Sequence, residues 1–553
     1  MTTKRFNHIV LFFHILSNLS CVRPKSVDTI IHNATIFSLN QDNMIYESMA
    51  IKNGKIIAIG KENQILNKYS SKTKIDLKKQ FVFPGFIDSH CHFLQYGIQK
   101  EKINLEKAKS FDEIISILKK VNQKDSNSWI QGYGWDQNEW EKISYPNYLN
   151  NKKLNQLFPN QPVILSRIDG HAIMVNQKAI DIAKIPLDTI ISGGRIEYIN
   201  GDYTGIFIDN AMDLIFNKIP EPNEYEKKKA LLKAQKDCLA AGLTTLDIAG
   251  LDYQDIELIQ NLHHSNELKI RIYAMISDNN ENFSYFIDSI GEPILEPKLT
   301  VRSFKFFADG SLGSRGACLI KPYSDINKNH YGQILTNMDN YIKKLNTLNE
   351  YGFQACTHAI GDSANREILK AYSKILKGHN DKRWRDEHAQ CIDPIDLHYF
   401  RDFNIIPSVQ PTHATSDFIW ALTRIGKERL NNCYQYNTLF NQNQLIILGT
   451  DFPVEGINPL QTFYAAVYRK NKKNRPIGGF QIKEALSNID AIKGMTFWAT
   501  LGNFEEKNKG SLEIGKFADF IVLNNDITTC NENEVLKTKV LRTFIGGEQV
   551  YKN

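Results

Sequence analysis

Cysteine is scarce in this sequence: there are eight in 553 residues, and none of them forms a CxxC pair. Cysteines this far apart do not indicate a disulfide framework, and we expect most of them to be small buried side chains. Beyond the N-terminal segment, no apolar run reaches the length of a transmembrane helix, and no repeat or low-complexity stretch is visible. Since 42% of the residues are hydrophobic and 23% are charged, a disordered or fibrous chain is excluded.

A large excess of charge of one sign is lacking as well. The 67 lysines and arginines stand against 61 acidic residues, a net charge of +6. Over this length the excess is too small to predict a nucleic-acid partner. The length itself excludes one compact core, because single cores stop growing near ~250–300 residues. We therefore expect either two domains or one large barrel with additions.

The N-terminal segment is typical of a secretory signal. Lys4 and Arg5 precede an apolar stretch from Ile9 to Leu16, and small residues follow it. This predicts a signal over residues 1–21. The pair Ser20-Cys21 resembles a lipoprotein cleavage site, which predicts an exported protein that is periplasmic or anchored to the membrane through a lipidated Cys21. The alternative is an apolar N-terminal helix on a cytoplasmic protein.

Both ends of the chain are rich in predicted strands. Asn53-Gly54 lies between two alternating apolar runs, which is a strong hairpin signal, and Gly546-Gly547 predicts a second hairpin. The simplest account is one β-sandwich domain that is split between residues 26–81 and residues 504–553.

The middle of the chain, residues 82–503, alternates strands with helical patterns, which indicates parallel βα units. Eight strands are predicted, the number that a closed (β/α)8 barrel of the TIM type needs. The gap between the first two strands is too long for a plain connection. We interpret residues 100–235, with the amphipathic stretch Tyr225–Leu239, as a subdomain inserted over the mouth of a distorted barrel. The predicted strands are 82–90, 244–249, 270–276, 301–308, 352–358, 385–389, 405–410 and 445–451.

Polar residues of one chemical kind lie at the ends of these strands. His90 and His92 end the first strand, and period-two geometry points both toward the barrel mouth. Each residue alone has an ordinary structural explanation, such as a helix N-cap for an aspartate or a solvated lysine. Together they predict a metal site, since functional groups of βα barrels lie at the strand C-termini. The further members are Lys305, His358, His388 and Asp451.

This pattern resembles the amidohydrolase superfamily, and within it amidohydrolase family 3, the YtcJ-like branch that includes N-substituted formamide deformylases. The resemblance extends over almost the whole chain after the leader, but it does not fix the substrate. The stretches that carry it are VFPGFIDSHCHF, FKFFADGSLGSRGA, THAIGDSANREIL, DEHAQ, LGTDFPV and GSLEIGKFADFIVL.

The resemblance implies two divalent metal ions. His90 and His92 would bind the more buried ion with Asp451, while His358 and His388 would bind the second. Lys305, N-carboxylated on its amine, would bridge the two ions. A mononuclear site at His90, His92 and Asp451 is the alternative if Lys305 is unmodified. Histidine and carboxylate ligands suit Zn²⁺, although Fe, Mn or Co fit the same set.

The same ligands imply a hydrolytic mechanism. Metal ions activate water and polarise a carbonyl, and Asp451 would be the catalytic base and then the acid. Asp309 and Arg315 follow the fourth strand, where Arg315 would bind a substrate carboxylate or pair with an acid. His171 would reach the substrate by the family likeness, or be a structural residue of the insertion. Trp135 is a candidate for the substrate-pocket wall, with the insertion core as the alternative.

We therefore predict a metal-dependent hydrolase of a carbon–nitrogen bond other than a peptide bond. A small N-formyl or N-acyl amine is the first substrate class to test. The alternatives are a cyclic amide hydrolase and a non-catalytic cell-surface binding protein that keeps the barrel. The expected partner is a small amide rather than a nucleic acid, and the sequence leaves a homodimer open.

Overall fold

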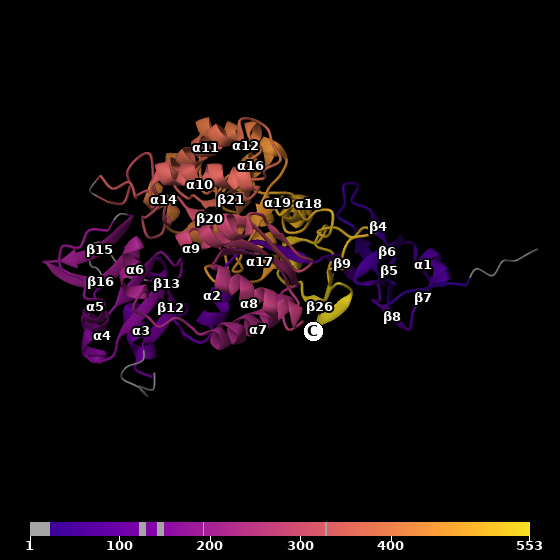
Figure 1. Cartoon of the computed structure of the whole chain (residues 1–553), viewed down its shortest axis with the longest axis horizontal. Helices are drawn as coiled ribbons and strands as arrows, with labels where there is room; N and C mark the ends of the chain where they lie inside the picture. The colour runs from indigo at the N-terminus through magenta and orange to yellow at the C-terminus, as the bar shows by residue number, and fades with distance from the viewer. Residues whose placement is uncertain (1–22, 121–128, 141–148, 192, 327–328) are drawn as a thin grey trace, which may run out of the picture.

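The computed structural model of the chain describes residues 23–120, 129–140, 149–191, 193–326 and 329–553 (Figure 1). The predicted signal, with Cys21, lies outside the described residues. Within the described ranges, no helix has the length and apolar character that crossing a membrane requires.

The central sheet is a barrel of eight parallel strands in chain order, and this confirms the predicted architecture. Beyond its last strand the barrel is closed by backbone bonds, because the N–H of Asp451 donates to the carbonyl of His90 and the N–H of His92 to that of Phe452, both at 2.8 Å. The strands are β10 (Phe86–Cys91), β17 (Leu243–Leu251), β18 (Arg271–Ser277), β20 (Leu299–Phe307), β21 (Gln354–His358), β22 (Arg385–Glu387), β23 (Ile406–Val409) and β24 (Ile447–Leu448). A short strand β19 (Ile294–Leu295) pairs with β20 at the side of this path.

The first predicted strand, 82–90, is in fact two strands that belong to different sheets. β9 (Phe81–Pro84) pairs with strands from both ends of the chain, and only β10 belongs to the barrel. Gly85 separates them, and a Cβ there would lie 2.2 Å from the hydroxyl oxygen of Thr244. A residue with a side chain would therefore clash at the point where the chain passes from one sheet to the other.

The two ends of the chain form two larger sheets that pack together, and a short two-stranded sheet of β1 (Lys25–Ser26) and β7 (Tyr69–Ser70) lies among the N-terminal strands. One has the order β6-β5-β2-β8, and the other the order β27-β26-β25-β9-β3-β4, so the second sheet joins both ends of the sequence. Both predicted hairpins occur, and the glycines of their turns have positive φ. The strands are β2 (Thr29–His32), β3 (Thr35–Phe37), β4 (Ile45–Tyr46), β5 (Ser48–Lys52), β6 (Lys55–Gly60), β8 (Thr73–Asp76), β25 (Phe520–Leu523), β26 (Val540–Ile545) and β27 (Glu548–Lys552).

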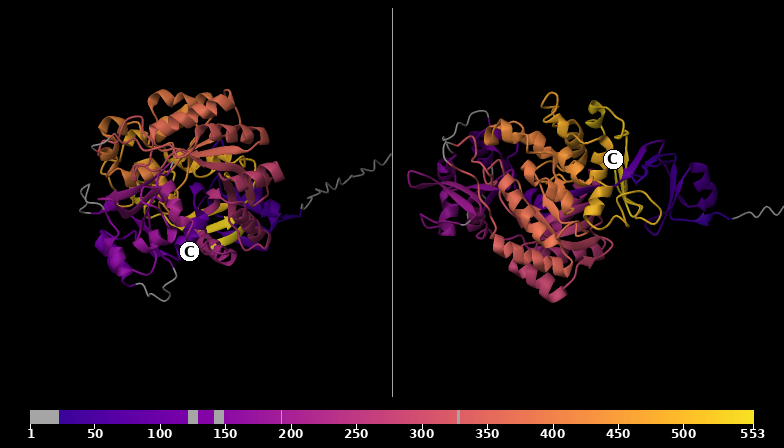
Figure 2. Two further views of the ribbon diagram at one scale, coloured as in Figure 1. Left: turned by 60° about the vertical axis from the view of Figure 1, so that its left-hand side comes forward. Right: turned by 90° about the horizontal axis from the view of Figure 1, so that it is seen from above.

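A third unit is built on a six-stranded sheet with the order β11-β12-β13-β14-β16-β15. Figure 2 shows it at one end of the barrel, with the N-terminal strands at the other end. It contains the apolar clusters around Trp135 and around Phe207. We call it the insertion. Its strands are β11 (Ile103–Asn104), β12 (Ile130–Trp135), β13 (Val163–Arg167), β14 (Ala172–Val175), β15 (Gly194–Ile199) and β16 (Asp202–Asp209).

The insertion ends earlier than the sequence pattern suggests. Helix α7 (Glu224–Ala240), which we expected within it, packs instead beside α2 (Phe93–Gln99). Leu231 and Leu239 of α7 belong to the barrel core cluster, and Gly97 of α2 approaches the backbone of Ala230 closely. The amphipathic face of this helix is therefore buried by the barrel.

Candidate active site

A cavity of about 620 Å³ lies at the C-terminal ends of the barrel strands. Barrel residues line its inner part, which we call the floor, and residues of the insertion line a facing part, which we call the roof. The six residues predicted as metal ligands all lie in the floor. They are His90, His92, Lys305, His358, His388 and Asp451, while Asp136, Arg167, Asp169 and His171 line the roof.

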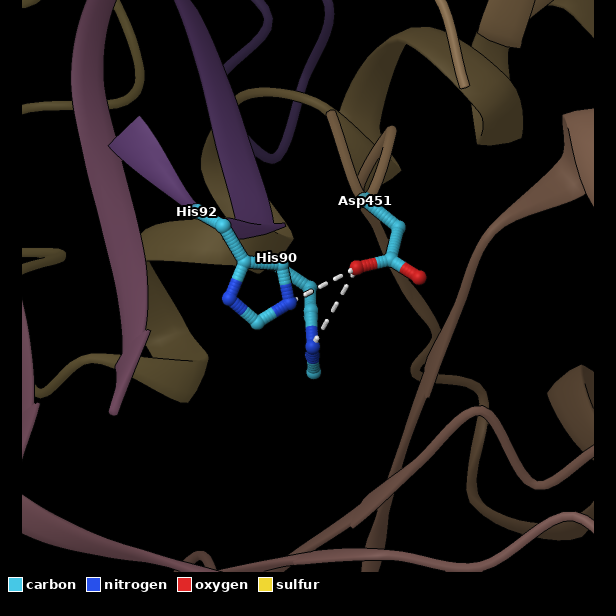
Figure 3. A group of neighbouring side chains, drawn as sticks. All are labelled: His90, His92 and Asp451. Atoms are coloured by element: carbon cyan, nitrogen blue, oxygen red, sulfur yellow. Dashed lines mark ion pairs between the residues drawn. The ribbon is translucent and has the colours of Figure 1, made fainter. Parts of the chain in front are cut away.

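One group of potential metal ligands in the floor is formed by His90, His92 and Asp451 (Figure 3). The Nε2 atom of His92 lies 3.1 Å from Oδ1 of Asp451, and Nε2 of His90 lies 3.7 Å from the same oxygen. Two imidazole nitrogens and one carboxylate oxygen at these separations can surround one divalent ion, since each ligand atom would then be about 2.0–2.2 Å from it.

A buried ionic chain fixes the orientation of His90. Its Nδ1 atom lies 2.5 Å from Oε2 of Glu387, whose other oxygen is 2.6 Å from Nε of Arg385. Arg385 also donates to Asp247 at 3.0 Å, and all four side chains are fully buried. Burial alone would raise the pKa of Glu387, but the charge of Arg385, together with His90 and Lys305, outweighs it and holds that pKa well below its usual range. Because Nδ1 is engaged, Nε2 is the nitrogen that His90 offers to the cavity.

The other three predicted ligands stand beside this group. Nζ of the buried Lys305 lies 3.3 Å from Nε2 of His90, and burial lowers the pKa of this lysine to about 8. The rings of His358 and His388 are 4.5 Å apart, and burial holds the pKa of each well below its usual value, so both imidazoles are neutral. Neutral imidazole is the form that binds metal ions.

Backbone conformation supports a functional role for two of these residues. His388 has φ +77° and Asp451 has φ +61°, although neither is glycine. Left-handed conformations of such residues are costly and are concentrated at functional sites. His388 directly follows β22, and Asp451 lies three residues beyond the end of β24, so both positive φ values occur where the chain turns after a barrel strand.

His413 is a residue of the floor that the sequence analysis missed. It lies in the short helix α13 (Pro411–Asp417) after β23, and its Nε2 atom is 3.1 Å from Oδ2 of Asp451. Its Nδ1 atom is 3.5 Å from Oε1 of Glu455. Burial disfavours the charged imidazole, but the hydrogen bonds to Asp451 and Glu455, together with the negative charges of these two acids, outweigh it and raise the pKa of His413 to about 10. Its position after the seventh barrel strand was the available signal.

The roof is held together by Arg167. Its guanidinium donates to Gln137 at 2.8 Å, to Asp136 at 2.6 Å, and to Asp169. Asp169 in turn accepts a bond of 2.5 Å from Ser311 of the barrel side. The roof therefore carries a charged side chain whose donors are already engaged.

Of the four predicted substrate-binding residues, His171 lines the cavity and the other three lie beside or behind it. His171 lines the cavity, with Nδ1 at 2.8 Å from Asp209 and its ring 5.3 Å from that of His358. Asp309 is buried beside the cavity, where it accepts backbone N–H bonds from Ile360, Gly361 and Cys318.

Arg315 and Trp135 lie behind the cavity surface. Arg315 pairs with Asp325 at 2.9 Å, which corresponds to the acid-pairing alternative. Trp135 is buried in the insertion core, where its Nε1 donates to the carbonyl of Leu165 at 2.8 Å. Neither is among the residues that line the described cavity.

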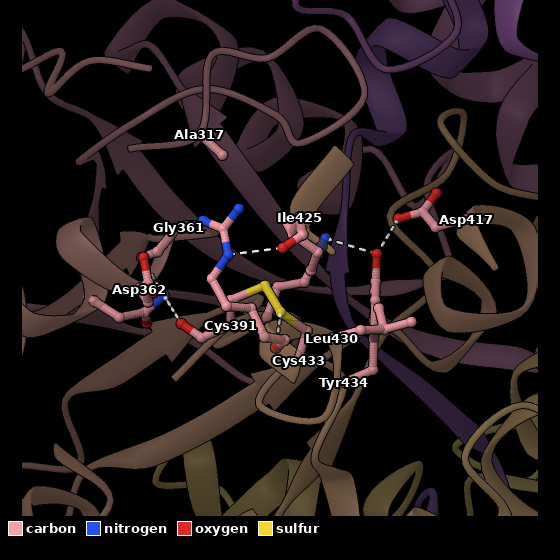
Figure 4. Close-up of a disulfide and its surroundings, with 12 residues drawn as sticks. Ala317, Gly361, Asp362, Cys391, Asp417, Ile425, Leu430, Cys433 and Tyr434 are labelled. Atoms are coloured by element: carbon pink, nitrogen blue, oxygen red, sulfur yellow. Dashed lines mark hydrogen bonds between the residues drawn. A yellow bond between two sulfur atoms is a disulfide. The ribbon is translucent and has the colours of Figure 1, made fainter. Parts of the chain in front are cut away.

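A disulfide joins Cys391 to Cys433 beside the cavity (Figure 4), whereas the spacing of the cysteines had not indicated a disulfide framework. It connects the segment after His388 to Tyr434. The hydroxyl of Tyr434 accepts a bond of 3.0 Å from Gln390 and donates to Asp417 at 2.8 Å. Gln390 and Asp417 both line the cavity, so the disulfide holds together two parts of its wall.

Comparison with known proteins adds independent evidence. A model described as "Amidohydrolase family" matches residues 73–551. Protein LONG AFTER FAR-RED 3 of Arabidopsis thaliana is 31% identical, covering 98% of this chain and 94% of its own length. Putative amidohydrolase YtcJ of Bacillus subtilis is 30% identical, and the match covers 94% of this chain and 99% of that protein. N-substituted formamide deformylase of Arthrobacter pascens is 22% identical, and the match covers 95% of this chain and 98% of that protein.

A solved structure resembles the whole fold. The crystal structure of an uncharacterized metal-dependent hydrolase from Pyrococcus horikoshii has a TM-score of 0.75 and 26% sequence identity to this chain. The match covers 91% of this chain and 99% of that one.

Proposed function

The chain belongs to the amidohydrolase family, whose structural relatives are metal-dependent hydrolases, and from this premise we propose that it hydrolyses the carbon–nitrogen bond of a small amide. The observation that carries the proposal is the meeting of His90, His92 and Asp451 at the base of a cavity large enough for a small molecule. We propose an N-formyl or N-acyl amine as the substrate class. The similarity to a formamide deformylase over 95% of the chain supports it.

The residues present fit two divalent metal ions. Three buried atoms of the floor have no hydrogen-bond partner among the described residues, although unpaired buried polar atoms are costly. They are Nε2 of His358, Nδ1 of His388 and Oδ1 of Asp451. We propose that His90, His92 and Asp451 hold one zinc ion and that His358 and His388 hold a second.

We propose that Lys305 is N-carboxylated and bridges the two ions. Carboxylation requires the neutral amine. Because the pKa of Lys305 is lowered to about 8, a larger fraction of this amine is neutral at neutral pH than in an exposed lysine. Bound divalent ions would supply a polarised carbonyl and a water molecule of lowered pKa.

The chain's own residues would then handle the substrate and the proton. Asp451, whose carboxylate lies in the cavity, would take a proton from the attacking water and deliver it to the leaving nitrogen. His171 lines the cavity near His358 and would contact the substrate from the roof. The carboxylate of Glu455 also lines the wall, which favours a neutral or amine-bearing substrate over one with a carboxylate.

We further propose that the protein is exported, either to the periplasm or as a lipoprotein anchored through Cys21. The disulfide between Cys391 and Cys433 supports this proposal, because disulfides persist mainly in oxidising compartments. Detection of the mature chain in a membrane fraction with a lipid on Cys21 would support the lipoprotein form. Recovery of the full-length chain with its leader from the cytoplasm alone would contradict export.

The proposed activity is tested by one combined experiment. Zinc per chain is measured on the purified protein, and the same sample is assayed with formamides, N-acyl amino acids and cyclic imides. We expect turnover of the formamides above the other two groups. A sample with its zinc verified that turns over none of them would contradict the proposal.

A further inference from the structure

The two oxygens of the Asp451 carboxylate face different partners. Oδ1 faces Nε2 of His92 at 3.1 Å and of His90 at 3.7 Å, without the geometry of a hydrogen bond. Oδ2 accepts a hydrogen bond of 3.1 Å from Nε2 of His413. The first oxygen is thus directed at the metal position of the proposed function, and the second is held by a protein side chain.

His413 is itself held in place on its far side. Nδ1 lies 3.5 Å from Oε1 of Glu455, and the same carboxylate oxygen accepts a bond of 2.6 Å from the hydroxyl of Ser416. The imidazole is 12% exposed, at the edge of the cavity. It therefore lies between two carboxylates and connects Asp451 to a second, independently anchored acid.

The alternative is that His413 is a metal ligand. Ligand atoms of His388, His413 and Asp451 lie within 4.8 Å of one another, which is compatible with an ion. However, the buried atoms without a hydrogen-bond partner belong to His358, His388 and Asp451 among the described residues of the floor, and not to His413. Both of its nitrogens already face carboxylates.

We propose that His413 is a positioning residue, which together with Glu455 fixes the Asp451 carboxylate so that Oδ1 is presented to a metal ion. This inference rests on the metal placement of the proposed function. Without the bond to Oδ2 the carboxylate can rotate about the Cβ–Cγ bond of Asp451. Metal binding would then have to order the carboxylate, which weakens the metal affinity. Losing such an outer partner of a ligand typically costs about 10–100-fold in metal affinity.

The test measures zinc binding and does not depend on a substrate. Zinc per chain at saturation and the zinc Kd, from competition with a chelator, are determined for the wild type and for His413→Leu, His413→Gln and Glu455→Gln. His398→Leu is the matched control, because His398 is an exposed histidine of the outer helix α12 (His398–Asp402). Circular dichroism and Tm report on folding.

We expect His413→Leu to bind as many ions as the wild type at saturation, with a Kd raised about 10–100-fold. His413→Gln keeps a hydrogen-bond donor near the same place, so its zinc Kd is expected to lie between those of the wild type and His413→Leu. Glu455→Gln weakens the anchor and is expected to raise the Kd by less than the leucine variant does. The control is expected to match the wild type.

Two results would overturn the inference. An unchanged Kd in folded His413→Leu would leave His413 a structural residue, and the loss of one ion at saturation would make it a ligand. If the leucine variant does not fold, an unchanged Kd in Glu455→Gln overturns the inference. If the wild type binds zinc and the variants bind it equally well, only the role of His413 is refuted. If the wild type itself binds no zinc, both the proposed metal placement and the role of His413 are refuted.

Discussion

The floor and the roof of the cavity satisfy their polar groups in different ways. In the roof, Arg167 has acceptors for its donors in Gln137, Asp136 and Asp169. In the floor, Nε2 of His358 and Oδ1 of Asp451 have no hydrogen-bond partner among the described residues, although they are buried. The charged group of the roof is thus paired within the protein, while the floor leaves buried ligand atoms that bound cations would satisfy.

The difference separates two tasks within one cavity. A floor of unpaired ligand atoms at and just beyond the ends of barrel strands is suited to binding metal ions, since the barrel holds these side chains more rigidly than long loops would. A roof that is already paired offers shape and a fixed charge pattern to the substrate. Changes in the floor should therefore affect chemistry and metal content, and changes in the roof should affect the choice of substrate.

The largest effect is expected in the floor, from Asp451→Asn. The amide keeps the shape of the side chain but cannot act as a base, so kcat on the best amide substrate should fall by about 10²–10⁴-fold. The fold should be retained, which circular dichroism would verify. Full turnover by this variant, with its metal content measured, would refute the role of Asp451.

Arg167→Met changes the roof, where we expect an effect on stability and KM but not on zinc content. It leaves Asp136 and Asp169 without their buried cation, which should lower the free energy of unfolding by about 3–5 kcal/mol. Zinc per chain should stay at the wild-type value, and KM should rise. A loss of zinc from the folded variant would show that floor and roof are not separate.

The disulfide tests the connection between parts of the wall. Cys391 and Cys433 are 42 residues apart, so the double variant Cys391→Ser with Cys433→Ser should lose roughly 2–4 kcal/mol of stability in denaturant unfolding. Because the bond holds Gln390 and Asp417 through Tyr434, KM should change more than zinc content. Equal stability of the variant and the wild type would contradict this account of the wall.

A smaller effect concerns the pH dependence of metal loading at Lys305. With a pKa of about 8, the amine is mostly protonated at pH 6.5 and mostly neutral at pH 8.5, and only the neutral form can be carboxylated. At fixed carbon dioxide pressure, the rate at which zinc-free protein regains its second ion should rise roughly 20-fold between these pH values. Lys305→Met should show no such rise, and a wild-type rate independent of pH would contradict a carboxylated lysine.

The sequence predicted the barrel well because its signals are local. Each of the eight strands carries its own apolar pattern, and five of them carry ligand residue types at or near their ends. Period-two geometry was enough to place His90 and His92 on one side. The helix α7 was assigned to the insertion because its amphipathic pattern does not say which surface will bury it.

The features that were missed depend on contacts between distant segments. His413 lies on a helix after β23, and its relation to Asp451 is set by the closure of the barrel rather than by any motif. Glu387 stands next to a predicted ligand, but its contact with His90 spans 297 positions. The disulfide partners are likewise brought together only by the folded wall.

Anomalous diffraction at the zinc edge, from crystals of the zinc-loaded protein, tests the central claim most directly. Two peaks are predicted in the floor, one about 2.0–2.2 Å from Nε2 of His90, Nε2 of His92 and Oδ1 of Asp451, and one beside His358 and His388. A floor without a peak, or zinc bound only elsewhere on the protein, would contradict the claim.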